Sequence, residues 1–232
     1  MKERGIIFNA EMVRAILDGR KTQTRRVMKV QPVLNGDRWE VYSTSVEKGN
    51  KSIPVTPWGS LENNCPYGKV GDHLWVRETY SLLGNEDACP IDWNDNIVND
   101  KTEAARIYRA SCAQKSGDYG LWSIPDEADW KPHTEEMKFE GSWTPSIHMP
   151  RWASRITLEI THVHVERLQS ISKQDSISEG APRGHHSIDV ISKQFGFPDF
   201  SRSWFAQIWM DIYGEDNWAA NPWVWVIEFK RV

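Results

Sequence analysis

The sequence predicts a mixed α+β fold built around a small barrel-like β-sheet with short flanking helices. Short apolar strand patterns are separated by single helical patterns, and both ends of the chain carry a strand pattern, at residues 5–8 and 223–229. This alternation is typical of small mixed sheets with a few covering helices. A chain of 232 residues with 39% hydrophobic content can bury a substantial core and still form one elaborated domain. We therefore expect a single domain over residues 1–232.

The first unit of the chain is predicted to be a strand, a helix and a polar strand. After the strand at residues 5–8, Asn9 is a suitable helix N-cap, and apolar residues follow at helical spacing: Met12, Val13, Ile16 and Leu17. Gly19 stands where a glycine C-cap belongs. Residues 20–28 are too polar for a core strand but contain two threonines, so they predict an extended edge or the lining of a cleft.

Four later segments have strand character. Residues 39–42 are a short candidate strand in a mixed, turn-rich region. Residues 73–79 follow strong turn signals and alternate apolar and polar side chains. Residues 156–161 also alternate, in the pattern of a half-buried strand. Residues 223–229 form the final apolar strand.

Two later segments have helical character. Ser172 and Asp175 have the spacing of a capping box, which predicts a short helix that Gly180 closes, with Glu179 as its last residue. Apolar residues at helical spacing over 205–212 predict a second helix, and Gly214 is its stop signal.

Composition places limits on location and partners. The three cysteines, Cys65, Cys89 and Cys112, are odd in number and widely spaced, which fits neither a disulfide framework nor paired zinc ligands, so a reducing cytoplasm is expected. No apolar run approaches the roughly 20 residues of a membrane helix, so no membrane association is expected.

Charge is distributed unevenly along the chain. The net charge is −4, yet Lys and Arg crowd the first thirty residues, while residues 86–140 are rich in Asp and Glu. An acidic stretch is unsuited to lying along a phosphate backbone. We therefore predict that about residues 81–145 are an insertion.

Two features are candidates for chemistry. The first is a run of like charges, Arg20, Lys21, Arg25 and Arg26, because cationic neighbours favour the neutral form of a lysine and prepare it as a general base. The second is Glu179, because the negative end of a helix disfavours a carboxylate and suits it to proton donation. A solvated basic surface and an exposed glutamate at a frayed helix end are the alternatives for these two features.

Metal and cofactor signals are weak in this sequence. His162 and His164 lie on the same face of a strand, but no third ligand is nearby in sequence, so no metal is expected. The sequence contains no G-x-S-x-G motif, no phosphate-loop glycine motif and no Cys-His signature, which argues against the usual hydrolases and nucleotide triphosphatases. We expect no cofactor.

Three segments resemble the ASCH domain family. They are AILDGRKTQTRR at residues 15–26, GDHLWVRE at residues 71–78, and WVIEF at residues 225–229. The resemblance implies a PUA-like β-barrel and RNA binding. The segment IHMPRWASR at residues 147–155 is similar to longer members from bacteriophages and prophages.

The string from Gly19 to Arg26 also resembles that of the small bacterial N(4)-acetylcytidine amidohydrolases. The resemblance implies that Lys21 is the catalytic base, that Thr24 is the nucleophile that attacks the amide carbonyl, and that Glu179 protonates the leaving amine. It implies RNA or a modified pyrimidine nucleoside as the partner. The residues expected to hold that ligand are Arg20, Arg25, Arg26, Arg77, Glu78, Arg151, Trp152 and Arg155. The alternatives are a non-catalytic reader of RNA or of a modified base, and a ribonuclease.

Overall fold

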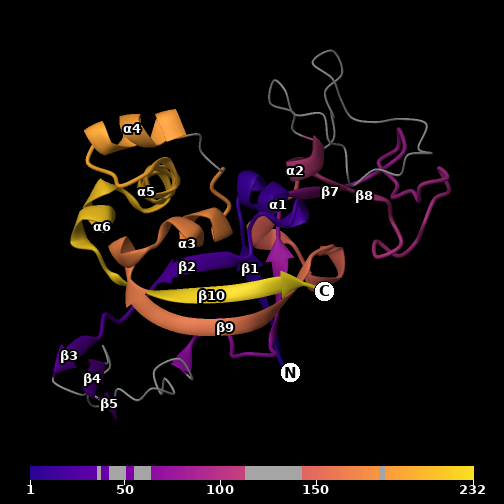
Figure 1. Cartoon of the computed structure of the whole chain (residues 1–232). Coiled ribbons are helices and arrows are strands. Elements are labelled where there is room, and N and C mark those ends of the chain that lie inside the picture. Colours follow the sequence, from indigo (N-terminus) through magenta and orange to yellow (C-terminus); the bar gives the residue numbers. More distant parts are fainter. Residues whose placement is uncertain (36–37, 42–50, 55–63, 113–142, 183–185) are drawn as a thin grey trace. The chain divides into compact units, whose positions relative to one another are not determined.

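The computed structural model describes residues 1–35, 38–41, 51–54, 64–112, 143–182 and 186–232 (Figure 1). The α+β class predicted from the sequence is confirmed, with one five-stranded sheet, two smaller sheets and several short helices. None of the helices in these ranges is long and apolar enough to cross a membrane.

The five-stranded sheet has the order β1-β6-β9-β10-β2. Its strands are β1 (Glu3–Ile7), β6 (His73–Arg77), β9 (Thr157–Arg167), β10 (Trp223–Arg231) and β2 (Gln23–Val27). β10 pairs antiparallel with both β9 and β2. β1 and β2 are the two end strands, and within the described residues no pairing joins them into the closed barrel that the sequence predicted.

Two smaller sheets complete the strand inventory of the described residues. The first contains β3 (Val33–Asn35), β4 (Arg38–Val41) and β5 (Lys51–Pro54), and the second contains β7 (Tyr80–Leu82) and β8 (Arg106–Tyr108). β4 corresponds to the strand expected at residues 39–42, of which residue 42 lies outside the described residues.

Three of the six α-helices in the described residues were predicted, and most of their ends lie at the residues that the capping signals indicated. The six helices are α1 (Ala10–Leu17), α2 (Arg109–Cys112), α3 (Lys173–Ser178), α4 (His186–Gln194), α5 (Phe200–Tyr213) and α6 (Glu215–Ala220), with short 3-10 turns at Ser146–His148, Arg151–Ala153 and Leu168–Ser170. Asn9 Oδ1 accepts the Met12 amide at 2.8 Å, and Ser172 and Asp175 form the reciprocal capping box.

The strand and helix ends differ from prediction in several places. β9 covers eleven residues, well beyond the predicted end at residue 161, and α5 begins at Phe200 with Asp199 as its N-cap. The helices α2, α4 and α6 were not predicted, because short helices without a clear apolar stripe form mainly through packing. β2 is an end strand as expected, but Gln23, Thr24 and Arg25 are buried.

The contacts divide the chain into two compact units. The first unit contains residues 1–4, 15–74 and 158–232, and the second contains residues 5–14 and 75–157. In the first unit, Val224 and Val226 of β10 pack in one apolar cluster with Phe205 and Trp209 of α5. α3 contacts both β2 and α5 (Figure 1). One face of β2 and β10 is therefore covered by helices.

The second unit has apolar clusters of its own. One contains Leu83, Ile91, Ala105, Ile107 and Cys112, and another contains Tyr80, Tyr108, Met149 and Ala153. The described part of the predicted acidic insertion belongs to this unit, while residues 113–142 lie outside the described residues.

Candidate functional site

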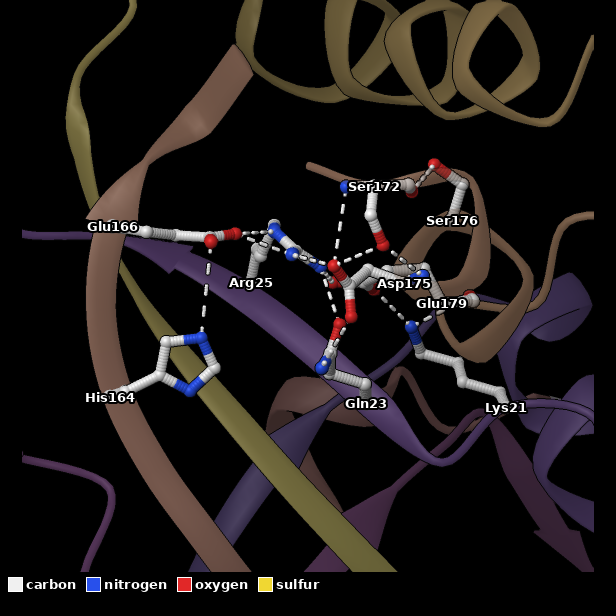
Figure 2. A network of polar contacts seen from close by, with 9 residues as sticks. All are labelled: Lys21, Gln23, Arg25, His164, Glu166, Ser172, Asp175, Ser176 and Glu179. Atoms are coloured by element: carbon white, nitrogen blue, oxygen red, sulfur yellow. Dashed lines mark hydrogen bonds and ion pairs between the residues drawn. The ribbon is translucent and has the colours of Figure 1, made fainter. Parts of the chain in front are cut away.

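The centre of the candidate site is a buried ion pair between Lys21 and Glu179 in the first unit (Figure 2). Lys21 Nζ lies 2.6 Å from Glu179 Oε2 and 2.9 Å from the backbone oxygen of the same residue. The side chains are 0% and 4% exposed. A buried amine and a buried carboxylate thus satisfy each other directly.

The backbone around this pair explains why the two side chains meet. Glu179 is the C-cap of α3, and the Thr22 amide donates to the carbonyl of Ser178 at 2.8 Å. The Lys21 amide donates to the carbonyl of Ala15 at the end of α1. The segment that leads into β2 is therefore tied to the ends of two helices, and Lys21 is held beside the last turn of α3.

Arg25 extends the pair into a network. Its Nε donates to Glu166 Oε1 at 2.9 Å, and its Nη2 donates to the same oxygen. Its Nη1 donates to Gln23 Oε1 at 2.6 Å and to Glu179 Oε1 at 3.2 Å. The Arg25 side chain is fully buried. One guanidinium thus links the carboxylates of β9 and α3.

Two further residues close the network. Asp175 Oδ2 lies 3.7 Å from Arg25 Nη2, and Asp175 Oδ1 accepts from Gln23 Nε2 at 3.4 Å. At the other end, His164 Nε2 lies 3.9 Å from Glu166 Oε2 (Figure 2). The network therefore runs from a half-buried histidine on β9 to the buried Lys21 amine.

Burial lowers the pKa of Lys21 below its ordinary value, because the charged ammonium is removed from water. The Glu179 carboxylate opposes this shift, and the positive charges of Arg26 and Arg25 add to it. The sequence predicted the lowering from cationic neighbours alone. Burial is the larger cause, and it follows from the packing around Lys21.

Two of the carboxylates around Arg25, those of Glu166 and Asp175, are held in their charged form. Burial by itself raises the pKa of Glu166, but the hydrogen bond to His164 and the charge of Arg25 outweigh it, so the pKa lies below the ordinary value. For Asp175, burial is likewise outweighed, here by hydrogen bonds from Ser172 and by the charge of Arg25. Arg25 is thus surrounded by anionic partners.

Thr24 lies on the other face of β2 from Arg25. Arg25 is opposite Val226 of β10, whose side chain packs against α5, whereas Thr24 is opposite Ile227. Because side chains alternate along a strand, Thr24 and Arg26 project away from Gln23 and Arg25. Among the described residues, no hydrogen bond joins Thr24 to Lys21 or Glu179. The structure brings together the predicted base and acid, and it places the predicted nucleophile on the opposite face.

Arg20 is the remaining predicted ligand contact of the first unit. Its Nη1 donates to the carbonyl of Gly180 at 3.1 Å, and its Nη2 lies 2.9 Å from Asp18. The side chain is about half exposed.

The other predicted ligand contacts belong to the second unit. Arg155 binds Glu78 through two parallel hydrogen bonds of 2.9 Å, and its guanidinium lies 4.1 Å from the ring centre of Tyr108. Arg77 donates to the carbonyl of Ile147 and stacks on Trp75. Arg155, Glu78 and Arg77 thus have protein partners. Arg151 and Trp152 are exposed and have partners as well: Arg151 Nη2 donates to Thr157 Oγ1 at 3.2 Å, and the Arg106 guanidinium lies 5.7 Å from the Trp152 ring centre.

Gln23, Glu166 and Asp175 are the site residues that the sequence did not single out, and His164 was considered there only as a metal ligand. Gln23 alternates with Arg25 in the polar strand, which is a signal that could have found it. Glu166 lies beyond the predicted end of its strand, and Asp175 was assigned only to capping. In the part of the chain that is described, no group of His, Cys, Asp or Glu is arranged to hold a metal ion.

Comparisons with known proteins identify no relative. The sequence matches no protein-family model, and no curated protein or solved structure is significantly similar to it.

Proposed function

We propose that this chain is a hydrolase that removes an acyl group from a modified pyrimidine nucleoside such as N(4)-acetylcytidine, as a relative of the ASCH proteins and their PUA-like fold. The observation that carries the proposal is the buried contact of 2.6 Å between the Lys21 amine and the Glu179 carboxylate. A lysine with a lowered pKa beside a carboxylate is a suitable acid-base pair.

The pair is chemically competent because one proton serves both residues. With that proton on Glu179, Lys21 is a neutral amine and accepts a proton from the attacking nucleophile. Glu179 is then a neutral acid and donates its proton to the nitrogen that leaves. The pair finishes the step with the proton on Lys21, and transfer across the 2.6 Å contact restores the starting state.

The resemblance to the small amidohydrolases assigns the nucleophile to Thr24. Thr24 is buried and lies three positions after Lys21, on the opposite face of β2 from Arg25. Its attack requires the two side chains to approach each other when substrate binds, and it leaves the acetyl group as an ester on the Thr24 hydroxyl. Water then hydrolyses this ester to acetate: Lys21 takes the proton of the water, and Glu179 returns a proton to the Thr24 oxygen. The Thr24 step is therefore tested separately from the acid-base pair.

The experiment that tests the enzyme is release of acetate and cytidine from N(4)-acetylcytidine by the purified protein. Wild type is expected to turn over, while Lys21→Met and Glu179→Gln are expected to lose activity. Lys230→Met removes an exposed lysine that pairs with Glu159 on the sheet, and it is the matched control that retains activity. No turnover by the wild type would refute the proposal for this substrate.

Thr24→Ser and Thr24→Val separate two nucleophiles. The serine variant keeps a hydroxyl and is expected to retain activity, and the valine variant has the same shape without the hydroxyl and is expected to lose it. If Thr24→Val retains wild-type activity, water at the Lys21 amine is the nucleophile, and the role of Thr24 is overturned.

A non-catalytic reader of RNA is the second candidate function. The burial of Lys21 and Glu179 away from solvent favours it. Lys21 and Glu179 are almost completely removed from solvent, so a substrate reaches them only after side chains move. A reader binds RNA in a salt-dependent manner, and Lys21→Met protein that is folded under the assay conditions keeps this binding. Such binding together with no turnover by the wild type would decide for the reader.

A further inference from the structure

Arg25 has its polar atoms committed to the protein. Nε and Nη2 bind Glu166, and Nη1 binds both Gln23 and Glu179. The guanidinium is fully buried and lies 5.7 Å from the ring centre of Phe205. These contacts make Arg25 an internal bridge between the carboxylates of Glu166 and Glu179. The sequence had predicted that Arg25 would instead bind a ligand.

We propose that Glu166 is a positioning residue that, through the Arg25 guanidinium, holds the Glu179 carboxylate against the Lys21 amine. Its meaning for catalysis rests on the proposed function. Glu166 itself is one bridge away from the reacting pair and touches neither Lys21 nor Glu179 in the contacts described.

The planar geometry of the arginine side chain explains how Glu166 fixes the position of the Glu179 carboxylate. The guanidinium is a rigid planar fork, so fixing two of its nitrogens fixes the direction of the third. Nε and Nη2 share one oxygen of Glu166, and this contact sets the plane in which Nη1 reaches Glu179 Oε1. Glu179 Oε2 is then turned toward Lys21 Nζ. Charge-assisted bonds of this kind are stronger than neutral ones, and burial strengthens them further.

The charged groups around this bridge come from three elements. β2 contributes Arg25 and Arg26, β9 contributes His164 and Glu166, and α3 contributes Asp175 and Glu179. α5 contributes the uncharged ring of Phe205. Glu166 offsets the charge of Arg25, so removing the Glu166 charge leaves Arg25 less neutralised beside Lys21 and Glu179. Lys21 then holds its proton less tightly.

The test is a pH titration of the Lys21 amine by NMR on protein labelled at lysine, with the signal assigned through Lys21→Met. Glu166→Gln keeps the shape and removes the charge, and it is expected to move the Lys21 titration to lower pH. With N(4)-acetylcytidine as substrate, the limb of the pH-rate profile that reports Lys21 moves the same way, and kcat falls by up to about 100-fold at nearly constant KM. Glu159→Gln, which removes a charge on the same strand outside the network, is the matched control and leaves the titration unchanged.

Arg25→Gln supplies a second test with the opposite sign. It removes a positive charge, so the Lys21 titration is expected to move to higher pH, and this variant decides the matter if Glu166→Gln does not fold. A purely structural role lowers stability without moving the titration. A Lys21 titration that is the same in wild type and in the folded variants would overturn the inference. The NMR result does not depend on turnover, so shifted titrations in a protein without hydrolase activity refute the proposed function and leave the positioning role supported.

Discussion

The Lys21 amine lies 2.6 Å from a carboxylate oxygen of Glu179, which is 158 positions further along the chain. Both side chains are buried, and the contact joins the segment before β2 to the end of α3. A charge removed from water needs a partner of opposite charge or a shift of its pKa, and Lys21 has both. The same contact is therefore important for stability and for the proposed chemistry.

Removing one partner of this pair is expected to destabilise the fold strongly. Lys21→Met removes the nearest positive charge from the buried Glu179 carboxylate, which keeps Arg25 as its other cationic partner. Breaking a buried ion pair by removing one partner costs about 3–5 kcal/mol of unfolding free energy. Urea unfolding measures this change. The double variant Lys21→Met/Glu179→Leu removes both charges and is expected to recover much of the loss. Additive losses in the double variant would contradict a direct pairing.

Gly180 is expected to tolerate no side chain. Its φ of +108° is unfavourable for other residues, and a Cβ there would lie 3.2 Å from the Ala15 Cβ and 3.5 Å from the Lys21 Cβ. Gly180→Ala should cost about 1 kcal/mol or more of unfolding free energy. Gly19→Ala is the control, because Gly19 also has positive φ but its Cβ would meet nothing within 4 Å. The prediction fails if Gly19→Ala is the more damaging of the two.

Asp72 is expected to make folding sensitive to acid. The amide of Lys2 donates to its carboxylate at 2.8 Å, and this hydrogen bond is the main reason that its pKa lies below the ordinary value; the Lys69 amide and Arg4 act in the same direction. A lowered pKa in the folded state contributes stability above the unfolded pKa of about 3.9, and that stability is lost as the pH falls through the folded pKa.

Urea unfolding of wild type and Asp72→Asn between about pH 2 and pH 6 measures this contribution. The stability difference between the two proteins should be largest near pH 6 and shrink on acidification. Asp216→Asn, at the exposed start of α6, is the control. A difference that does not change with pH would rule out the Asp72 carboxylate as the source.

Arg155 is expected to be irreplaceable by lysine in the second unit. Its two hydrogen bonds to the buried Glu78 and its stacking on Tyr108 require a planar guanidinium. Arg155→Lys should lower the unfolding free energy by about 1.5–3 kcal/mol, measured by urea unfolding. Arg151→Lys, at an exposed neighbouring position, should change it little. Equal effects of the two substitutions would contradict the anchoring role of Arg155.

The local structure of the chain could be predicted well because its signals act over a few residues. The N-cap at Asn9, the capping box of Ser172 and Asp175, and the stop at Gly214 are hydrogen bonds or backbone conformations set by neighbouring positions. The class of the fold follows from the same short-range periodicities.

The sequence could not predict features that depend on contacts between segments far apart in the chain. The sequence nominated Lys21 and Glu179 separately, but it attributed the state of Lys21 to its cationic neighbours. Burial is the larger effect, and it exists only after α1, β2 and α3 have packed. Glu166 gave no signal, because it lies past the predicted end of its strand and acts through an arginine 141 positions earlier.

By itself, the sequence determined the α+β class, the helix boundaries near their caps, and a polar strand at the sheet edge that carries the candidate residues. The tertiary structure alone decided that Lys21 meets Glu179, that Arg25 serves carboxylates of the protein, and that Thr24 projects from the opposite face of β2. The physical reason is the sequence distance over which each interaction acts. Capping and alternation are properties of adjacent residues, whereas burial and ion pairing depend on which distant segments the folded chain brings into contact.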